Sequence, residues 1–362
     1  MSSRPRDLLV FSLGFGTCAA AALLLRSRRP PRAAAPPSPA SPAPPVRVTP
    51  SSPPPPAPLP PNLRAEQLSR NALFFPPPGL ASLQSSTVLV VGLGGVGSHA
   101  AHMLARSGAG RLVLVDFDQV TLSSTNRHAV ATLGDVGRAK VAATKSFLQK
   151  AAPNCEVVAL AEMFTGESAA GIMDGRGKVH FVVDAIDDVP TKAELVRCCV
   201  ARGLPLISSM GAACKSDPTR LHIGDLRSVS KDPLCTKLRW HLKKLGVDPD
   251  SPLLRILYSS EKQTAALAGL TREQRESPGE FGSVDNMRLR VLPVLGTMPA
   301  IMGQAAAAYV ACELAGKPFR PVEAERLGKQ VRHRLLQHVK NREGEARKRI
   351  EAGEGGLKAG VG

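Results

Sequence analysis

The stretch Thr87-Val-Leu-Val-Val-Gly-Leu-Gly-Gly-Val-Gly97 decides the fold of this chain. Its first five residues are mostly apolar and β-branched, which predicts a buried strand, and residues 96–107 predict a helix. The turn between them fits the pattern G-x-G-x-x-G and contains Gly92, Gly94, Gly95 and Gly97. Glycines let the backbone approach a phosphate group, and the N-terminus of the helix faces its negative charge. We therefore expect these glycines to bind the phosphates of an adenine nucleotide.

Strand-like and helix-like segments alternate after this turn. Strands are predicted at 111–116, 155–160, 180–185 and 205–209, and helices at 138–150 and 191–202. Such alternation predicts an α/β fold with a doubly wound, mostly parallel Rossmann-type sheet. Beyond residue 209 the pattern is looser, and a C-terminal α/β extension is expected with a strand at 221–226 and helices at 234–245 and 298–314.

A carboxylate follows at the distance that nucleotide-binding folds use. Asp116 ends the second predicted strand, about 20 residues after the glycine-rich turn, where a carboxylate can bind ribose hydroxyl groups. The turn and this carboxylate fit an ATP-dependent enzyme and a nicotinamide-dependent oxidoreductase equally well.

Composition divides the chain into four parts. Residues 1–29 contain the uncharged, mostly apolar run 8–25 with basic flanks. Its length is close to the ~17–25 residues that cross a bilayer, so we expect a membrane anchor that leaves the rest of the chain in the cytosol. A cleaved secretory signal and a mitochondrial presequence are the alternatives. Residues 30–62 are rich in Pro, Ala and Ser and predict an extended linker, 63–322 form the catalytic domain, and 323–362 are a charged, partly disordered tail.

Charge and cysteine content restrict the function further. Lys and Arg number 47 against 30 Asp and Glu, and the net charge of +17 favours polyanionic partners such as nucleotides, RNA or an acidic membrane. The seven cysteines are scattered and include no C-x-x-C pair, which argues against a disulfide framework and a four-thiolate zinc site. We therefore expect no zinc.

Four further blocks distinguish between the two enzyme classes. They are Val115-Asp-Phe-Asp118, Leu122-Ser-Ser-Thr-Asn-Arg127, Gly137-Arg-Ala-Lys140 and Asp184-Ala-Ile-Asp187. In this order and at this spacing they resemble the E1-like (ThiF/MoeB) superfamily of ATP-dependent adenylating enzymes. The resemblance implies ATP contacts by Asp116, Asp118, Asn126, Arg127 and Lys140, a Mg²⁺ ligand in Asp187, and a homodimer in which Arg70 of one subunit reaches the ATP of the other.

Electrostatics agrees with these roles. Adenylation brings a carboxylate against the α-phosphate of ATP, so cations must neutralise the charge that builds up and Mg²⁺ needs a hard oxygen ligand. Arg127 and Lys140 supply the positive charge and Asp187 the oxygen, and we take these three as the catalytic residues. A hydride transfer needs none of them.

Other stretches resemble the tRNA threonylcarbamoyladenosine dehydratases, especially their membrane-anchored eukaryotic forms. They include Ser208-Ser-Met-Gly-Ala212, Lys215-Ser-Asp-Pro-Thr219 and Val291-Leu-Pro-Val-Leu-Gly-Thr-Met-Pro299. The resemblance implies ATP-dependent conversion of N6-threonylcarbamoyladenosine at position 37 of tRNA to its cyclic form through an acyl-adenylate, releasing AMP and pyrophosphate. It also implies location on the mitochondrial outer membrane with the catalytic domain facing the cytosol, the endoplasmic reticulum being the alternative.

Candidate RNA contacts are numerous in the C-terminal half. The basic ones are Lys215, Arg220, Lys231, Lys237, Arg239, Lys243, Lys244, Arg288, Arg290, Arg332, His333 and Arg334. The aromatic residues Trp240 and Tyr258 could stack on a base, but core packing is the expectation for both. Cys214 and Cys235 are expected to be buried thiols, and the sequence does not define a role for either.

Three other functions stay open at this point. The first is activation of a ubiquitin-like or sulfur-carrier protein at a diglycine C-terminus. The second is an NAD-dependent oxidoreductase, which predicts NAD binding and no effect of Asp187→Ala. The third is a non-enzymatic scaffold, against which the joint presence of Arg127, Lys140 and Asp187 argues.

Overall fold

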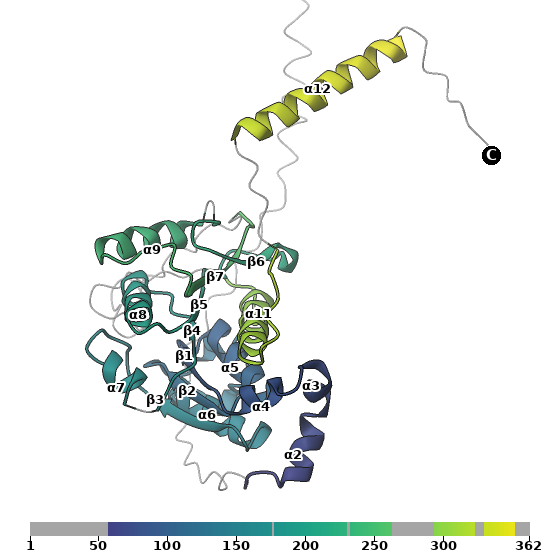
Figure 1. Ribbon diagram of the computed structural model, residues 1–362. Helices are drawn as coiled ribbons and strands as arrows, with labels where there is room; N and C mark the ends of the chain where they lie inside the picture. Colours follow the sequence, from purple (N-terminus) through teal and green to yellow (C-terminus); the bar gives the residue numbers. More distant parts are fainter. Residues whose placement is uncertain (1–56, 176, 230–231, 263–292, 323–328, 352–362) are drawn as a thin grey trace, which may run out of the picture. The chain divides into compact units, whose positions relative to one another are not determined.

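The computed structural model describes residues 57–175, 177–229, 232–262, 293–322 and 329–351 (Figure 1). All of them belong to the unit Ser52–Gly362. The predicted anchor at 8–25, most of the linker and the glycine-rich end of the tail lie outside the described residues. Within the described part, no helix combines the length and apolar character that crossing a bilayer requires.

The centre of the domain is a seven-stranded sheet in the order β3-β2-β1-β4-β5-β7-β6 (Figure 1). Its strands are β1 (Thr87–Val91), β2 (Arg111–Val115), β3 (Glu156–Leu160), β4 (Phe181–Asp184), β5 (Leu206–Ser209), β6 (Leu221–Gly224) and β7 (Leu254–Ser259). All neighbours pair in parallel except β6 and β7. The prediction of a doubly wound, mostly parallel sheet is confirmed.

Strand β7 is an addition to that prediction. Strand β7 lies between β5 and β6 and pairs with both. The strand predicted at 221–226, which is β6, is therefore the edge strand of the sheet and does not pair with β5. The apolar run Leu254–Ser259, which follows Pro252, was an available strand signal.

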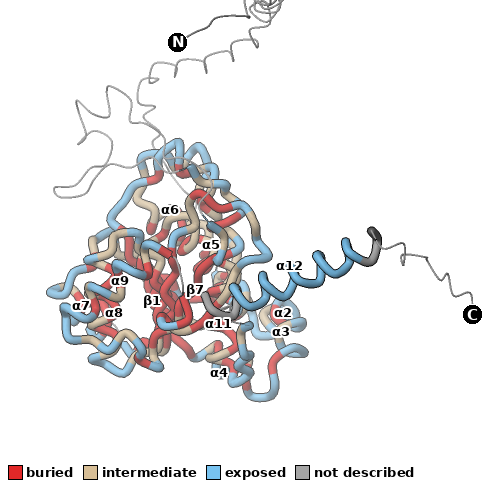
Figure 2. Tube along the Cα trace, turned by 90° about the horizontal axis from the view of Figure 1, so that it is seen from above, coloured by how far each residue is buried: buried red, intermediate tan, exposed pale blue. Residues whose placement is uncertain are grey.

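Helices cover both faces of the sheet, as Figure 1 shows. One core contains side chains of α5 (Gly95–Ser107), α6 (Lys140–Ala151) and α11 (Thr297–Leu314). The other contains side chains of α7 (Ala169–Met173), α8 (Val189–Ala201) and α9 (Pro233–Lys244). Alternate residues of β1 enter the two cores, and the whole strand is buried (Figure 2). This explains the continuous apolar run at 87–91, because a parallel sheet covered on both faces has no polar side.

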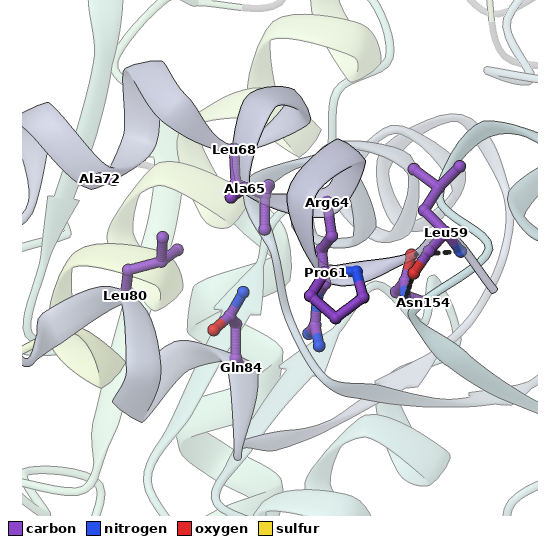
Figure 3. Close-up of a pocket in the computed structure, with 9 residues that line it drawn as sticks. All are labelled: Leu59, Pro61, Arg64, Ala65, Leu68, Ala72, Leu80, Gln84 and Asn154. Carbon is purple, nitrogen blue, oxygen red and sulfur yellow. Dashed lines mark hydrogen bonds between the residues drawn. The ribbon is translucent and has the colours of Figure 1, made fainter.

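Three short helices that the sequence analysis did not predict precede the sheet. They are α2 (Pro61–Gln67), α3 (Ser69–Phe74) and α4 (Gly79–Gln84). The backbone of Leu59 exchanges two hydrogen bonds with the amide of Asn154, at 3.1 and 3.2 Å. Beside this contact, α2 and α4 line a cavity of about 410 Å³ (Figure 3). The end of the Pro-rich linker is therefore attached to the domain.

A long charged helix, α12 (Lys329–Glu351), occupies most of the tail. The sequence analysis described this segment only as charged and partly disordered. Its 23 residues include exposed Leu335, Leu336 and Val339.

Candidate active site at the carboxyl edge of the sheet

The glycine-rich turn lies where the strand order reverses. After β1 the chain continues outward to β2 and β3 and then returns to β4 on the other side of β1. In such sheets this switch point is where ligands bind. Gly92 has a φ of +88°, and a side chain there would also come within 2.7 Å of the Ala185 carbonyl oxygen. A Cβ on Gly97 would lie 1.7 Å from the Gly92 carbonyl oxygen, whereas one on Gly94 would meet nothing within 4 Å. The backbone at Gly94 is thus open to a ligand.

Asp116 lies against this turn directly after β2. Its carboxylate accepts the backbone N–H of Leu93 at 2.5 Å and that of Asp118 at 2.7 Å. Burial raises the pKa of Asp116, and the charge of Lys140 and the two N–H groups oppose that rise. Two fixed donors therefore orient this carboxylate beside the glycines, at the position predicted for ribose binding.

Lys140 is the first residue of α6, two residues after the predicted start of that helix. Its Nζ lies 2.6 Å from Oδ2 of Asp118, and its side chain is only 12% exposed. The helix is set there by backbone bonds: the N–H of Lys140 donates to the carbonyl of Asp118 at 3.0 Å. The structure thus brings Asp116, Asp118 and Lys140 together.

Arg127 and Asn126 approach the glycine-rich turn from its other side. Arg127 donates from Nη1 to the Ser123 carbonyl at 2.8 Å and to Oδ1 of Asn126 at 3.1 Å. A Cβ on Gly95 would come 3.4 Å from Cγ of Arg127. Among the described residues, neutral acceptors alone hold this guanidinium, which lies next to the predicted phosphate site.

The start of α11 packs over the same turn. A Cβ on Gly95 would lie 2.8 Å from Cβ of Pro299, and one on Gly296 would lie 2.5 Å from the Asn126 carbonyl oxygen. The stretch 291–299 carries part of the family resemblance, and its first two residues lie outside the described part. The described residues of this stretch support the loop that carries Asn126 and Arg127.

Asp187 is exposed and follows β4 by three residues. The turn before it is held by Asp184, whose Oδ1 accepts the N–H of Ile186 at 3.1 Å. Asp184 is fully buried and pairs with the equally buried Lys192 at 2.9 Å, and its Oδ2 also accepts the Ser208 hydroxyl at 2.6 Å. Lys192 was missed, although a lysine inside the apolar helical pattern of 189–201 was an available signal.

A divalent cation would find one suitable ligand here. In the part of the chain that the structure describes, no ion pair involves Asp187 and no group of three His, Cys, Asp or Glu side chains could hold a metal. Mg²⁺ commonly binds through one or two carboxylates plus the phosphates of its nucleotide. The exposed carboxylate of Asp187 fits that need.

His128 is a buried imidazole between the cationic residues. Its Nδ1 accepts the N–H groups of Val130 and Ala131, at 3.3 and 3.1 Å, which assigns the proton of the neutral ring to Nε2. Burial lowers the pKa of His128 to about 4, with a further contribution from the charge of Lys140. The ring is thus neutral at pH 7 and adds no charge to the site.

The structure corrects two expectations about the candidate RNA contacts. Lys215 is buried and bonds to Asp232 at 3.4 Å and to the Ser259 carbonyl at 3.2 Å, so it is an internal residue. Trp240 is 59% exposed, and the expectation that it packs in the core is wrong. Tyr258 is buried as expected.

The remaining predicted residues are placed as follows. Arg70 is exposed on α3, and Arg220 pairs with Asp217. Cys214 and Cys235 are buried, as expected, as are the other four described cysteines. Lys231, Arg288 and Arg290 lie outside the described residues.

Comparison with known proteins shows which family the chain belongs to. Residues 68–337 match the ThiF family model. The chain is 38% identical over 265 residues to tRNA threonylcarbamoyladenosine dehydratase 2 of Saccharomyces cerevisiae, covering 72% of this chain and 59% of that protein. It is 42% identical over 195 residues to the dehydratase of Bacillus subtilis, covering 54% of this chain and 75% of that protein. The chain therefore spans less than two thirds of the yeast relative and three quarters of the bacterial one.

A solved structure shares the arrangement. The crystal structure of the Escherichia coli tRNA N6-threonylcarbamoyladenosine dehydratase in complex with ATP aligns with a TM-score of 0.59 and 29% identity, over 70% of this chain and 95% of that chain. The family model covers well over half of the present sequence. The chain belongs to the ThiF family, among whose members it resembles the tRNA threonylcarbamoyladenosine dehydratases.

Proposed function

We propose that this chain uses ATP to convert N6-threonylcarbamoyladenosine at position 37 of tRNA to its cyclic form. One observation carries the proposal: the folded chain places two cations, Arg127 and Lys140, around an open glycine-rich turn and the oriented carboxylate of Asp116. An NAD-dependent oxidoreductase would use the turn and the carboxylate but not the cations. The names of the relatives in Saccharomyces and Bacillus, and the ATP in the related Escherichia coli structure, support the same reaction.

Each residue would act on ATP according to its place. Asp116 binds the ribose hydroxyl groups, and the N–H groups near Gly94 and the N-terminus of α5 bind phosphate oxygens. Arg127 and Lys140 neutralise the charge that grows on the phosphates when the threonyl carboxylate attacks the α-phosphorus and pyrophosphate leaves. Asp187 would hold Mg²⁺, which when bound offsets the charge of the phosphate oxygens.

The second half of the reaction needs no transfer cysteine. A nucleophile within the same modified base displaces AMP from the acyl-adenylate and closes the ring, with net loss of water. All six described cysteines are buried, and burial raises the pKa of Cys235 well above its usual range. Inert thiols support intramolecular closure better than transfer to a carrier protein through a cysteine.

Location and assembly are parts of the same proposal. Residues 8–25 would anchor the chain in the mitochondrial outer membrane with the catalytic domain facing the cytosol, and Arg70 would contact the ATP of a second subunit in a homodimer. Imaging a fusion of residues 1–62 with a fluorescent protein tests the location, since endoplasmic-reticulum staining would contradict it. Sedimentation of the protein tests the dimer, which a monomer at working concentration would exclude.

The reaction itself is tested by incubating the protein with ATP, Mg²⁺ and tRNA that carries the modification, followed by mass spectrometry of the nucleosides. The expected signal is the loss of one water per modified adenosine, together with AMP. Asp187→Ala and Lys140→Ala should abolish AMP formation while leaving the fold intact. Glu167→Ala and Lys150→Ala, which remove exposed charges of the same sign elsewhere, are the matched controls.

Three results would contradict the proposal. They are turnover at the wild-type rate in either site variant, binding of NAD in place of ATP, and AMP formation that depends on a diglycine carrier protein and not on tRNA. The second would indicate an oxidoreductase and the third a carrier-activating enzyme.

A further inference from the structure

Helix α9 presents a basic side with an aromatic residue in its middle. Trp240 is the single tryptophan of the chain and is 59% exposed. Lys237, Lys243 and Lys244 are exposed on the same helix. At 3.6 residues per turn these four positions fall within about 120° of the helix circumference, so they form one side, the α9 face.

The side chains of the α9 face take no part in the packing of the domain core. The packing of α9 is made by its opposite side, where Cys235, Leu238 and Leu242 are buried. Arg239 also turns inward and donates to the Leu226 carbonyl at 2.6 Å. Within the described residues, none of the three exposed lysines takes part in an ion pair. Positive charge and a large aromatic surface are therefore left facing solvent.

The charges around the α9 face do not cancel it. Nζ of Lys244 lies 5.4 Å from the centre of the Trp240 ring, and the ring of His241 packs edge-on against Trp240 at 4.8 Å. The carboxylate of Asp250 feels the charge of Lys243, but it is already bonded at 2.6 Å to Arg227, whose side chain is 69% exposed. The α9 helix itself, from Pro233 to Lys244, contains no Asp or Glu.

Helix α9 begins at the carboxyl edge of the sheet, where the candidate active site also lies, because Lys215 bonds both to Asp232 and to the carbonyl of Ser259 at the end of β7. Asp232, the N-terminal cap of α9, bonds to Lys215, and α9 packs along α8, whose Lys192 pairs with Asp184 before the turn that leads to Asp187. At ~1.5 Å per residue, Trp240 lies about 12 Å and Lys244 about 18 Å along the helix from that cap. A polyanion held at the active site could reach both.

We infer that the α9 face binds the tRNA next to the modified adenosine, with Lys237, Lys243 and Lys244 on backbone phosphates and Trp240 stacked on an unpaired base. This rests on the proposed function, which makes tRNA the substrate. Unpaired bases of RNA loops are recognised by aromatic stacking, and exposed lysines supply the electrostatic part of the affinity. A membrane surface fits less well, because a helix that lies on a bilayer needs a wide free apolar side and that of α9 is buried in the core.

Binding of modified tRNA to the full-length protein, measured by fluorescence anisotropy over a range of salt, tests the inference. Trp240→Ala should weaken binding about 10-fold, because stacking of one base is lost, and Trp240→Phe should recover most of it. Lys243→Ala with Lys244→Ala should lower the slope of log K against log salt by about 1.5 and raise KM for tRNA without changing kcat. The double variant Lys150→Ala with Lys178→Ala, which removes two exposed lysines elsewhere, should match wild type.

The outcomes separate this inference from the proposed function. If the wild type dehydrates tRNA and the Trp240 and Lys243/Lys244 variants bind it as wild type does, the α9 face is refuted and the function stands. If those variants bind tRNA normally but no longer bind vesicles of phosphatidylcholine and phosphatidylserine, the face is a membrane contact and the inference is wrong. If the wild type neither binds nor modifies tRNA, both fail.

Discussion

Replacing Lys192 with methionine should both destabilise the domain and disturb the candidate active site. Nζ of Lys192 lies 2.9 Å from Oδ2 of Asp184, 3.0 Å from the Ser209 carbonyl oxygen and 3.3 Å from the Ser208 hydroxyl, and both charged side chains are 0% exposed. Methionine fills similar space but leaves the Asp184 carboxylate buried without its counter-ion.

The size of the effect follows from that geometry. Removing one partner of a buried pair costs about 3–5 kcal/mol of unfolding free energy. Asp184 keeps its hydrogen bonds from Ser208 and Ile186, so we expect the lower end, ~3 kcal/mol. For a domain of this size that lowers Tm by about 6–12 °C. AMP formation should also fall at temperatures where the variant is folded, because Asp184 orders the turn that leads to Asp187.

Thermal and urea unfolding, followed by circular dichroism, measure the change. The double variant Asp184→Asn with Lys192→Met removes both charges and should regain at least about 1 kcal/mol relative to Lys192→Met alone. The reasoning is wrong if Lys192→Met unfolds within about 2 °C of wild type, or if the double variant is less stable than the single one.

Three further results are expected. Gly97→Ala should abolish ATP binding or folding, since its Cβ would lie 1.7 Å from the Gly92 carbonyl oxygen; calorimetric titration of a folded variant with wild-type affinity would contradict this. The folded-state pKa of His128 is about 4, below the ordinary 6.5, so the neutral ring contributes its full stability above pH 6.5 and loses up to ~3 kcal/mol of it as pH falls toward 4. Urea unfolding midpoints at pH 7 and pH 4.5 should show this loss in the wild type and a smaller loss in His128→Gln. Burial raises the pKa of Cys199 and Cys235, so an aromatic disulfide reagent should label neither in the native protein but both in urea, as peptide mapping would reveal.

The doubly wound, mostly parallel sheet and its glycine-rich turn could be predicted from short stretches of sequence. The strand at 87–91, the glycine-rich turn and Asp116 depend on local geometry: a strand buried on both faces, a turn that excludes side chains, and a carboxylate one strand further on. Lys140 and Arg127 were assigned to the site because their sequence blocks resemble those of the E1-like superfamily. Strand β7 and the three short helices before the sheet were missed, since their signals are brief and compete with those of loops.

The sequence by itself determined the doubly wound fold, the nucleotide turn and the set of charged residues around it. Only the tertiary structure decided which charges are internal and which meet a partner: Lys192 and Lys215 are buried, whereas Trp240 faces solvent. Composition cannot separate these cases, because a lysine or a tryptophan is stable in either environment once its partners are supplied. Those partners, such as Asp184 for Lys192 and Asp232 for Lys215, come from distant segments that meet only when the helices pack on the sheet.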